Sequence, residues 1–115
     1  MALPEFVAIR CKRLLDEYCE RKVPPHARHQ VRLVHEARGN SLTLLEMRAP
    51  WDGSDRPWTK LPIARFRFDP ETGDWELRCF DRNAKSHLFE PMASTKRFDA
   101  LLEEVERDRT GIFWG

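Results

Sequence analysis

The chain has 115 residues, of which 41% are apolar and 34% are charged, a composition typical of one folded globular domain over residues 1–115. Its 20 basic and 19 acidic side chains leave a net charge of +1, which excludes a strong overall field for recruiting nucleic acid or membranes. No apolar run approaches the roughly 20 residues of a membrane span, and no basic-then-apolar leader opens the sequence, so we expect no membrane partner.

A helix is predicted over residues 5–21, where apolar side chains recur at helical spacing. Pro4 suits its first turn, and Pro24-Pro25 end it. Its apolar stripe consists of Val7, Cys11, Leu14, Leu15 and Tyr18.

A hairpin is predicted next, with strands over residues 30–38 and 41–48 joined at Gly39-Asn40, a pair suited to a tight turn. Residues 49–62 hold three prolines and two tryptophans, so we expect a long loop there. Trp51 and Trp58 flank this loop; they are predicted to anchor it on the core, the alternative being the rim of a ligand pocket.

A second hairpin, over residues 63–69 and 74–80, has the clearest pattern in the chain, because apolar and polar residues alternate strictly on both sides of residues 70–73. Placing Phe68 opposite Trp75 aligns the other apolar residues on one face. The predicted apolar pairs are Phe68–Trp75, Phe66–Leu77 and Ala64–Cys79, and the pairs on the other face are Arg67–Glu76 and Arg65–Arg78.

A turn around Asn83-Ala84 is predicted to return the chain as a short strand that starts at Ser86. In that register Cys79 lies opposite Leu88, and Phe80 lies opposite His87.

The last helix is predicted to begin near Ser94 or Thr95 and to run to residue 108. Its buried stripe is Phe98, Leu101, Leu102 and Val105. The predicted fold is therefore α+β: one antiparallel sheet of about five meandering strands, flanked by an N-terminal and a C-terminal helix.

Four stretches resemble the bacterial family DUF3024, small stand-alone proteins of unknown function. They are RPW (56–58), IARFRF (63–68), WELRCFDRN (75–83) and the closing TGIFWG (110–115). The family usually carries a Trp-His pair after the DRN triplet, whereas this chain has Ser86-His87. The resemblance implies the boundaries of the domain and supplies no catalytic residues.

Arginines and aromatic residues share the second face of the predicted meander, together with Ile63 and Glu76. Single-stranded nucleic acid binders use this combination, since aromatic rings stack on bases and guanidinium groups pair with phosphates. The candidate binding residues are Arg65, Arg67, Arg78, Phe80, His87 and Phe89. We therefore expect a small binding module for single-stranded nucleic acid or an acidic partner. The alternative is that this face binds no ligand: Arg67 and Glu76 then form an ordinary cross-strand ion pair, and the aromatic residues pack under the long loop.

A second candidate site lies at the turn of Asp81, Arg82, Asn83 and His87. These side chains are suited to acid–base chemistry in a small enzyme, but Asp and Asn also close turns through their own side chains. No obvious nucleophile–base pair or Gly-rich phosphate loop accompanies them, so we expect no cofactor and favour the binding module.

The histidines and cysteines of the chain are candidate metal ligands. His26 and His29 form an HxxH, with His35 nearby, but a zinc site needs three or four ligands and Cys79 or His87 would have to complete it through the fold. We expect no metal. The three cysteines include no CxxC, and Cys11 and Cys19 lie about 12 Å apart by helical rise, so reduced thiols and a cytoplasmic location are expected.

The chain closes on Ile112, Phe113 and Trp114, which would form an aggregation-prone patch in water. We expect Gly111 to end the helix in a left-handed conformation and the tail to dock on the core of its own chain. The alternative is docking on a second copy or a partner, so a monomer and a homodimer both remain open.

Overall fold

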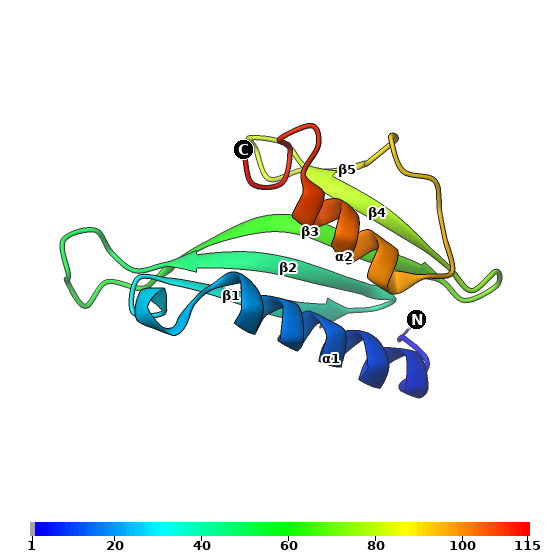
Figure 1. Cartoon of the computed structure of the whole chain (residues 1–115), viewed down its shortest axis with the longest axis horizontal. Helices are drawn as coiled ribbons and strands as arrows, with labels where there is room; N and C mark the ends of the chain where they lie inside the picture. Colours follow the sequence, from blue (N-terminus) through cyan, green and yellow to red (C-terminus); the bar gives the residue numbers. More distant parts are fainter. Residues whose placement is uncertain (1) are drawn as a thin grey trace.

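The structure is a computed structural model that describes residues 2–115. One five-stranded antiparallel sheet has the strand order β1-β2-β3-β4-β5, and the two helices flank it, which confirms the predicted α+β fold (Figure 1). The elements are α1 (Glu5–Lys22), a short 3-10 helix η1 (Pro25–Ala27), β1 (Val31–Arg38), β2 (Ser41–Arg48), β3 (Thr59–Asp69), β4 (Asp74–Phe80), β5 (Ser86–Leu88) and α2 (Phe98–Arg107).

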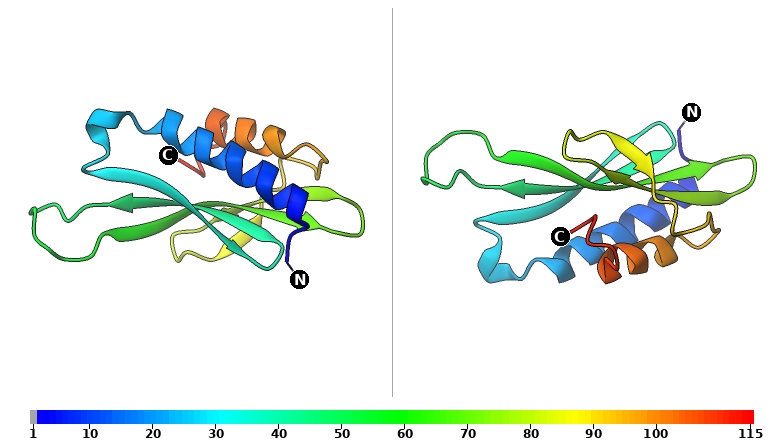
Figure 2. Two further views of the ribbon diagram at one scale, coloured as in Figure 1. Left: turned by 90° about the horizontal axis from the view of Figure 1, so that it is seen from below. Right: turned by 90° about the horizontal axis from the view of Figure 1, so that it is seen from above.

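Both helices lie on the same face of the sheet, which we call the inner face (Figure 2). Apolar side chains that alternate along the strands point to this face and pack against the helix stripes, as the period of two requires. The largest fully buried side chains of this core are Tyr18, Phe66, Phe98, Leu15, Leu42, Leu44, Leu77 and Leu101. The opposite face, which we call the outer face, is covered by neither helix (Figure 2).

The predicted register of the β3–β4 hairpin is confirmed, with Phe68 opposite Trp75 and Arg67 opposite Glu76. The predicted β4–β5 register is wrong by one residue, because Cys79 lies opposite His87 rather than Leu88. The connecting turn is one residue shorter than predicted and is closed by a hydrogen bond from Asp81 N–H to the Lys85 carbonyl, at 3.0 Å. A one-residue slip moves every β5 side chain to the other face of the sheet.

β3 begins at Thr59, so the predicted loop is four residues too long at its end. Pro62 was expected to exclude a strand there, but it lies opposite Leu45 at a register shift between Leu44 and Leu45. A bulge is one of the few strand positions that tolerate proline, because its missing N–H breaks no regular ladder bond. The bulge also turns Ile63 into the core, whereas alternation placed it on the outer face.

α2 begins at Phe98, and the expected cap residue Thr95 is used differently. Thr95 forms a two-way backbone bridge with Trp75, with N···O distances of 2.7 and 3.1 Å. The helix ends at Arg107 and is capped by Asp108, whose φ of +46° is left-handed, so Gly111 is not the helix-ending residue that the sequence predicted. Gly111 has a φ of +75° and lies in the next turn, where it redirects the tail.

The closing segment packs onto the core of its own chain. Phe113 is 5% exposed, and its ring centroid lies 5.1 Å from that of Phe89. Trp114 is partly buried against the same core, whereas Ile112 is 44% exposed. The Asp108 carboxylate accepts hydrogen bonds from the Phe113 and Trp114 N–H groups, each at 2.9 Å, and so holds the tail in this turn.

Candidate functional site

Arginines from β1 and β3 come together on the outer face because of the strand register. Ser41 of β2 lies between Arg38 and Arg67, opposite each of them in its own ladder. Thr43 lies in the same way between Glu36 and Arg65. The short Ser and Thr side chains between the long ones leave room above the sheet, since neighbouring strands are only about 4.8 Å apart.

Three of these arginines have no acidic partner within the part of the chain that the structure describes. Arg65 Nε donates to Thr43 Oγ1 at 3.2 Å, and its guanidinium lies 5.2 Å from the centroid of the Phe80 ring. Arg38 and Arg67 are exposed and make no side-chain hydrogen bond or ion pair with residues 2–115. Their charges are therefore available to an anion from solution.

Arg78, which we expected to bind a ligand with Arg65 and Arg67, is occupied instead. Its Nη1 forms an ion pair with Glu76 at 2.8 Å, and its Nε donates to Ser86 Oγ at 3.3 Å. The contact with Ser86 joins β4 to β5, and the ion pair with Glu76 lies within β4, so Arg78 has a positioning role in the fold.

A groove of about 410 Å³ runs over the outer face beside the free arginines. The β4–β5 hairpin bends away from the helices toward this side of the sheet, as both views of Figure 2 show. The lining residues are Glu36, Arg38, Ser41, Thr43, Leu45, Pro62, Arg65, Phe80 and Ala84. The groove thus combines an apolar part from Leu45, Pro62 and Phe80 with guanidinium and hydroxyl groups, and with the Glu36 carboxylate, which forms an ion pair with Lys60.

Two residues predicted for the outer face lie elsewhere. Phe89 is 4% exposed and packs on Phe113, and its N–H donates to the Leu77 carbonyl at 2.9 Å. His87 pairs with Cys79, which lies on the inner face with Trp75 and Leu77, so His87 does not join the arginines. The β4–β5 slip causes both errors.

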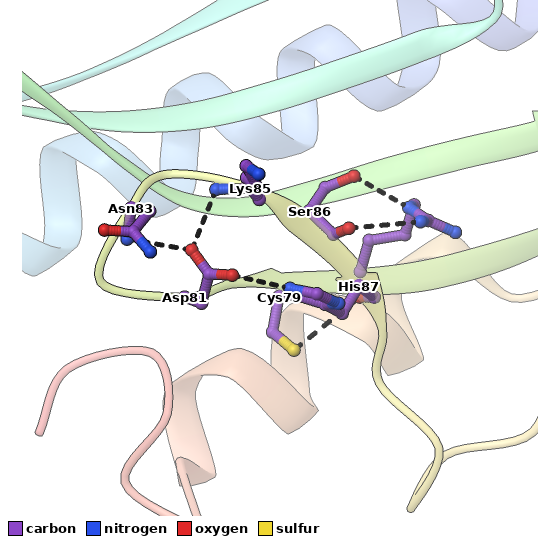
Figure 3. A network of polar contacts seen from close by, with 7 residues as sticks. Cys79, Asp81, Asn83, Lys85, Ser86 and His87 are labelled. Carbon is purple, nitrogen blue, oxygen red and sulfur yellow. Dashed lines mark hydrogen bonds and ion pairs between the residues drawn. The ribbon is translucent and has the colours of Figure 1, made fainter.

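The Asp81 turn is a network of local contacts, seen in Figure 3. Asp81 Oδ1 accepts hydrogen bonds from the N–H groups of Asn83, at 2.8 Å, and Lys85, at 3.0 Å, while Oδ2 lies 2.7 Å from His87 Nε2. These contacts, the one with His87 first, lower the pKa of Asp81 below its ordinary value. Arg82 and Asn83 are exposed. Because the turn itself uses both carboxylate oxygens, this geometry favours turn closure over acid–base chemistry.

The candidate metal ligands are dispersed. His26 and His29 are exposed around η1, whereas His35 Nε2 lies 2.6 Å from Asp16 Oδ1. Within residues 2–115 no three His, Cys, Asp or Glu side chains form a group suited to a metal ion. The thiol of Cys79 lies 3.6 Å from the His87 carbonyl oxygen, and burial raises its pKa.

The tryptophans of the long loop behave differently from each other. Trp51 is 91% exposed at the tip of the β2–β3 hairpin, so the prediction that it anchors the loop is wrong. The loop is held instead by its own polar contacts, including an Asp52–Arg56 ion pair of 2.9 Å. Trp58 packs under Arg32, whose guanidinium lies 4.5 Å from the ring centroid.

Sequence reasoning missed the contribution of the first hairpin to this site. Arg38, Ser41, Thr43 and Leu45 line the groove, and their alternation with Leu42 and Leu44 was available as a signal. No signal in the sequence indicates that Thr43 lies opposite Arg65, because this pairing depends on the bulge at Leu44/Leu45, which changes the offset between β2 and β3.

Comparison with known proteins gives one match. The model of the family described as "Domain of unknown function (DUF3024)" matches residues 3–115. No curated protein and no solved structure matches the chain. Within residues 2–115, the helices are all too short or too polar to cross a bilayer.

Proposed function

Since the chain belongs to the DUF3024 family, whose description states no activity, we propose from the geometry of the outer face that the protein is a binding module for single-stranded nucleic acid. The observation that carries this proposal is the set of three arginines without acidic partners, Arg38, Arg65 and Arg67, beside a groove with an aromatic wall. Phosphate groups pair with the guanidinium groups, and bases lie in the apolar part of the groove.

The chemistry of the groove supports a single strand over a duplex. Phe80 offers one ring at the groove wall, with Arg65 against it, and a base needs to be unpaired to reach such a ring. The Ser41 hydroxyl lies between Arg38 and Arg67, and the Thr43 hydroxyl lies between Glu36 and Arg65; both are suited to donate hydrogen bonds to phosphate or base oxygens. A single half-buried aromatic ring at the groove wall gives weak sequence preference, because every base has a face that stacks.

The charge balance of the chain supports a local rather than a global electrostatic mechanism. With a net charge of only +1, binding depends on the few arginines that are free of internal pairs. For three phosphate contacts the logarithm of affinity falls with a slope of about −2 against the logarithm of salt concentration. Binding is then expected to weaken roughly 20-fold from about 50 to 200 mM salt.

The test is a fluorescence-anisotropy titration with short single-stranded DNA and RNA at those two salt concentrations. The triple variant Arg38→Gln/Arg65→Gln/Arg67→Gln is expected to abolish most of the binding and its salt dependence. The matched control is Arg10→Gln/Lys12→Gln/Arg13→Gln, which removes the same charge from exposed positions on α1, on the other side of the molecule, and is expected to bind like wild type.

Other results contradict the proposal. Equal loss of binding in both triple variants would indicate nonspecific attraction to any positive surface. Absence of binding to DNA and RNA at low salt, combined with binding of a poly-glutamate peptide that depends on the same three arginines, would assign the face to an acidic protein partner instead.

A further inference from the structure

β1 forms one edge of the sheet, and its backbone offers a free row of hydrogen-bonding groups. Gln30 accepts a hydrogen bond from Ala49 N–H at 2.9 Å, and Arg38 and Ser41 close the two-residue hairpin. Even-numbered residues of β1 therefore bond to β2, and odd-numbered residues direct their N–H and C=O groups outward. The outward residues are Val31, Leu33, His35 and Ala37.

These outward groups are unusually unprotected for an edge strand. Within residues 2–115, no loop or side chain bonds to the backbone of the four outward residues. Proteins protect edges with prolines, bulges, very short strands or charged side chains. β1 has eight residues, no proline and a continuous register with β2, and of these protections it has only charged side chains, Arg32, Glu36 and Arg38. The other edge strand, β5, has only three residues.

The edge is also open beside its middle residues. A hollow of about 230 Å³ lies between the end of α1 and β1. Its lining residues are Cys19, Glu20, Val23, Arg28, Arg32, Leu33 and Val34. α1 therefore leaves space at the level of Leu33 and Val34 for a further strand to approach.

We propose that this edge is a homodimer interface, in which β1 pairs antiparallel with β1 of a second copy about a two-fold axis at Val34. This register pairs outward residues with outward residues, Leu33 with His35 and Val31 with Ala37, as an antiparallel ladder requires. The two sheets of five strands then become one continuous sheet, with both outer faces on the same side.

Charge complementarity selects a second copy and this register. In it, Arg32 of each copy lies opposite Glu36 of the other copy, on the outer face. If the axis lies one residue away, Arg32 faces Val34 (axis at Leu33) or Arg38 (axis at His35). If the axis lies two residues away, at Arg32 or at Glu36, that residue faces the same residue of the other copy. Opposite charges directly across a strand pair are stabilising and like charges are destabilising.

Both side chains retain the capacity for this contact. Arg32 Nε donates to the Arg28 carbonyl at 3.1 Å and its guanidinium lies over the Trp58 ring, while its two terminal nitrogens make no hydrogen bond with residues 2–115. Glu36 Oε2 forms an ion pair with Lys60 at 2.9 Å, and its other oxygen makes no hydrogen bond or ion pair with residues 2–115. Val34 meets its counterpart between the two ion pairs, which supplies an apolar centre for the interface.

The test is sedimentation velocity of the full chain over a wide range of concentration. Wild type is expected to sediment as a dimer of the 13.6 kDa chain. Arg32→Glu and Glu36→Arg each place like charges at both symmetric contacts, so each is expected to weaken the dimer by about ten- to thirtyfold. The double variant Arg32→Glu/Glu36→Arg restores opposite charges and is expected to return the dimer to wild-type strength.

Arg13→Glu is the matched control, because it makes the same charge change at an exposed α1 position without an ion pair in residues 2–115, and it leaves the dimer unchanged. A Val34→Cys variant is expected to form a disulfide-linked dimer under mild oxidation, since facing residues of a non-hydrogen-bonded pair have Cα atoms about 4.5 Å apart. A wild type that stays monomeric at every concentration overturns the proposal. A dimer that both single variants leave intact, or that the double variant does not restore, also overturns it.

The dimer is independent of the proposed nucleic-acid binding. Arg32 does not line the proposed groove, and Glu36, which does line it, is not one of the three arginines that carry the nucleic-acid proposal. Arg32→Glu therefore tests the dimer without changing the groove, so each proposal can fail without the other.

Discussion

Truncating Phe113 to alanine tests whether the closing segment is part of the hydrophobic core. The Phe113 side chain is nearly fully buried and packs on Phe89 at a ring-centroid distance of 5.1 Å. Loss of its transfer free energy, about 1.5–3 kcal/mol, adds to the cost of the cavity left behind. The expected loss of unfolding free energy is therefore about 3–5 kcal/mol.

The assay is equilibrium unfolding in urea, followed by tryptophan fluorescence and circular dichroism. With an m-value of about 1.5 kcal/mol per M, that loss lowers the unfolding midpoint by roughly 2–3 M. Ile112→Ala is the matched control in the same segment; its side chain is about half exposed, and we expect a loss below about 1 kcal/mol.

A double-mutant cycle with Phe89→Ala isolates the ring–ring contact. The coupling free energy between the two positions is expected to be about 0.5–1.5 kcal/mol, because tilted aromatic pairs contribute beyond their buried area. A Phe113→Ala variant as stable as Ile112→Ala, with no coupling to Phe89, would refute the inference that the tail completes the core.

Three further predictions concern local contacts. Asp108→Ala removes the acceptor of the Phe113 and Trp114 N–H groups and is expected to cost about 1–3 kcal/mol in thermal unfolding, whereas Asp108→Asn, which keeps one oxygen, costs less. The pKa of Asp81 is lower in the folded chain than in the unfolded one, so its stabilisation is complete above the unfolded pKa of about 3.9 and is lost as pH falls through the folded pKa. The stability difference between wild type and Asp81→Ala should therefore be constant near neutral pH and shrink in acid; a difference that grows in acid contradicts this sign. Burial raises the pKa of Cys11 to about 11, so a thiol reagent at neutral pH is expected to modify it only on unfolding, and rapid labelling of native Cys11 by mass spectrometry would contradict its burial.

The alternation of apolar and polar residues along each strand was sufficient to predict most of the fold. The β3–β4 register was correct because Phe66, Phe68, Trp75 and Leu77 must reach the same side of the sheet, and one face must be apolar. The helix stripes were correct for the same reason, with a period of 3.6 instead of two.

The β4–β5 offset was wrong because alternation within a strand does not determine the length of the turn before it. That length depends on Asp81, whose carboxylate holds the turn, and on Ala84, which has a φ of +60°, rare for alanine. Phe89 then becomes a core residue because Phe113, far along the chain, covers it. No local pattern around either residue reveals this contact.

The sequence by itself therefore determined the order of helices and strands and the apolar side of each, because both follow from the spacing of apolar residues along the chain. Only the tertiary structure decided which arginines are free. Arg78 is paired with Glu76 and tied to β5, while Arg38 of the distant first hairpin joins Arg65 at the groove, and Arg67 lies beside them, opposite Ser41. The physical reason is that the residues across the neighbouring strands decide whether an arginine forms an ion pair. Those neighbours depend on strand offsets, which turns and bulges set and which the spacing of apolar residues along the chain does not encode.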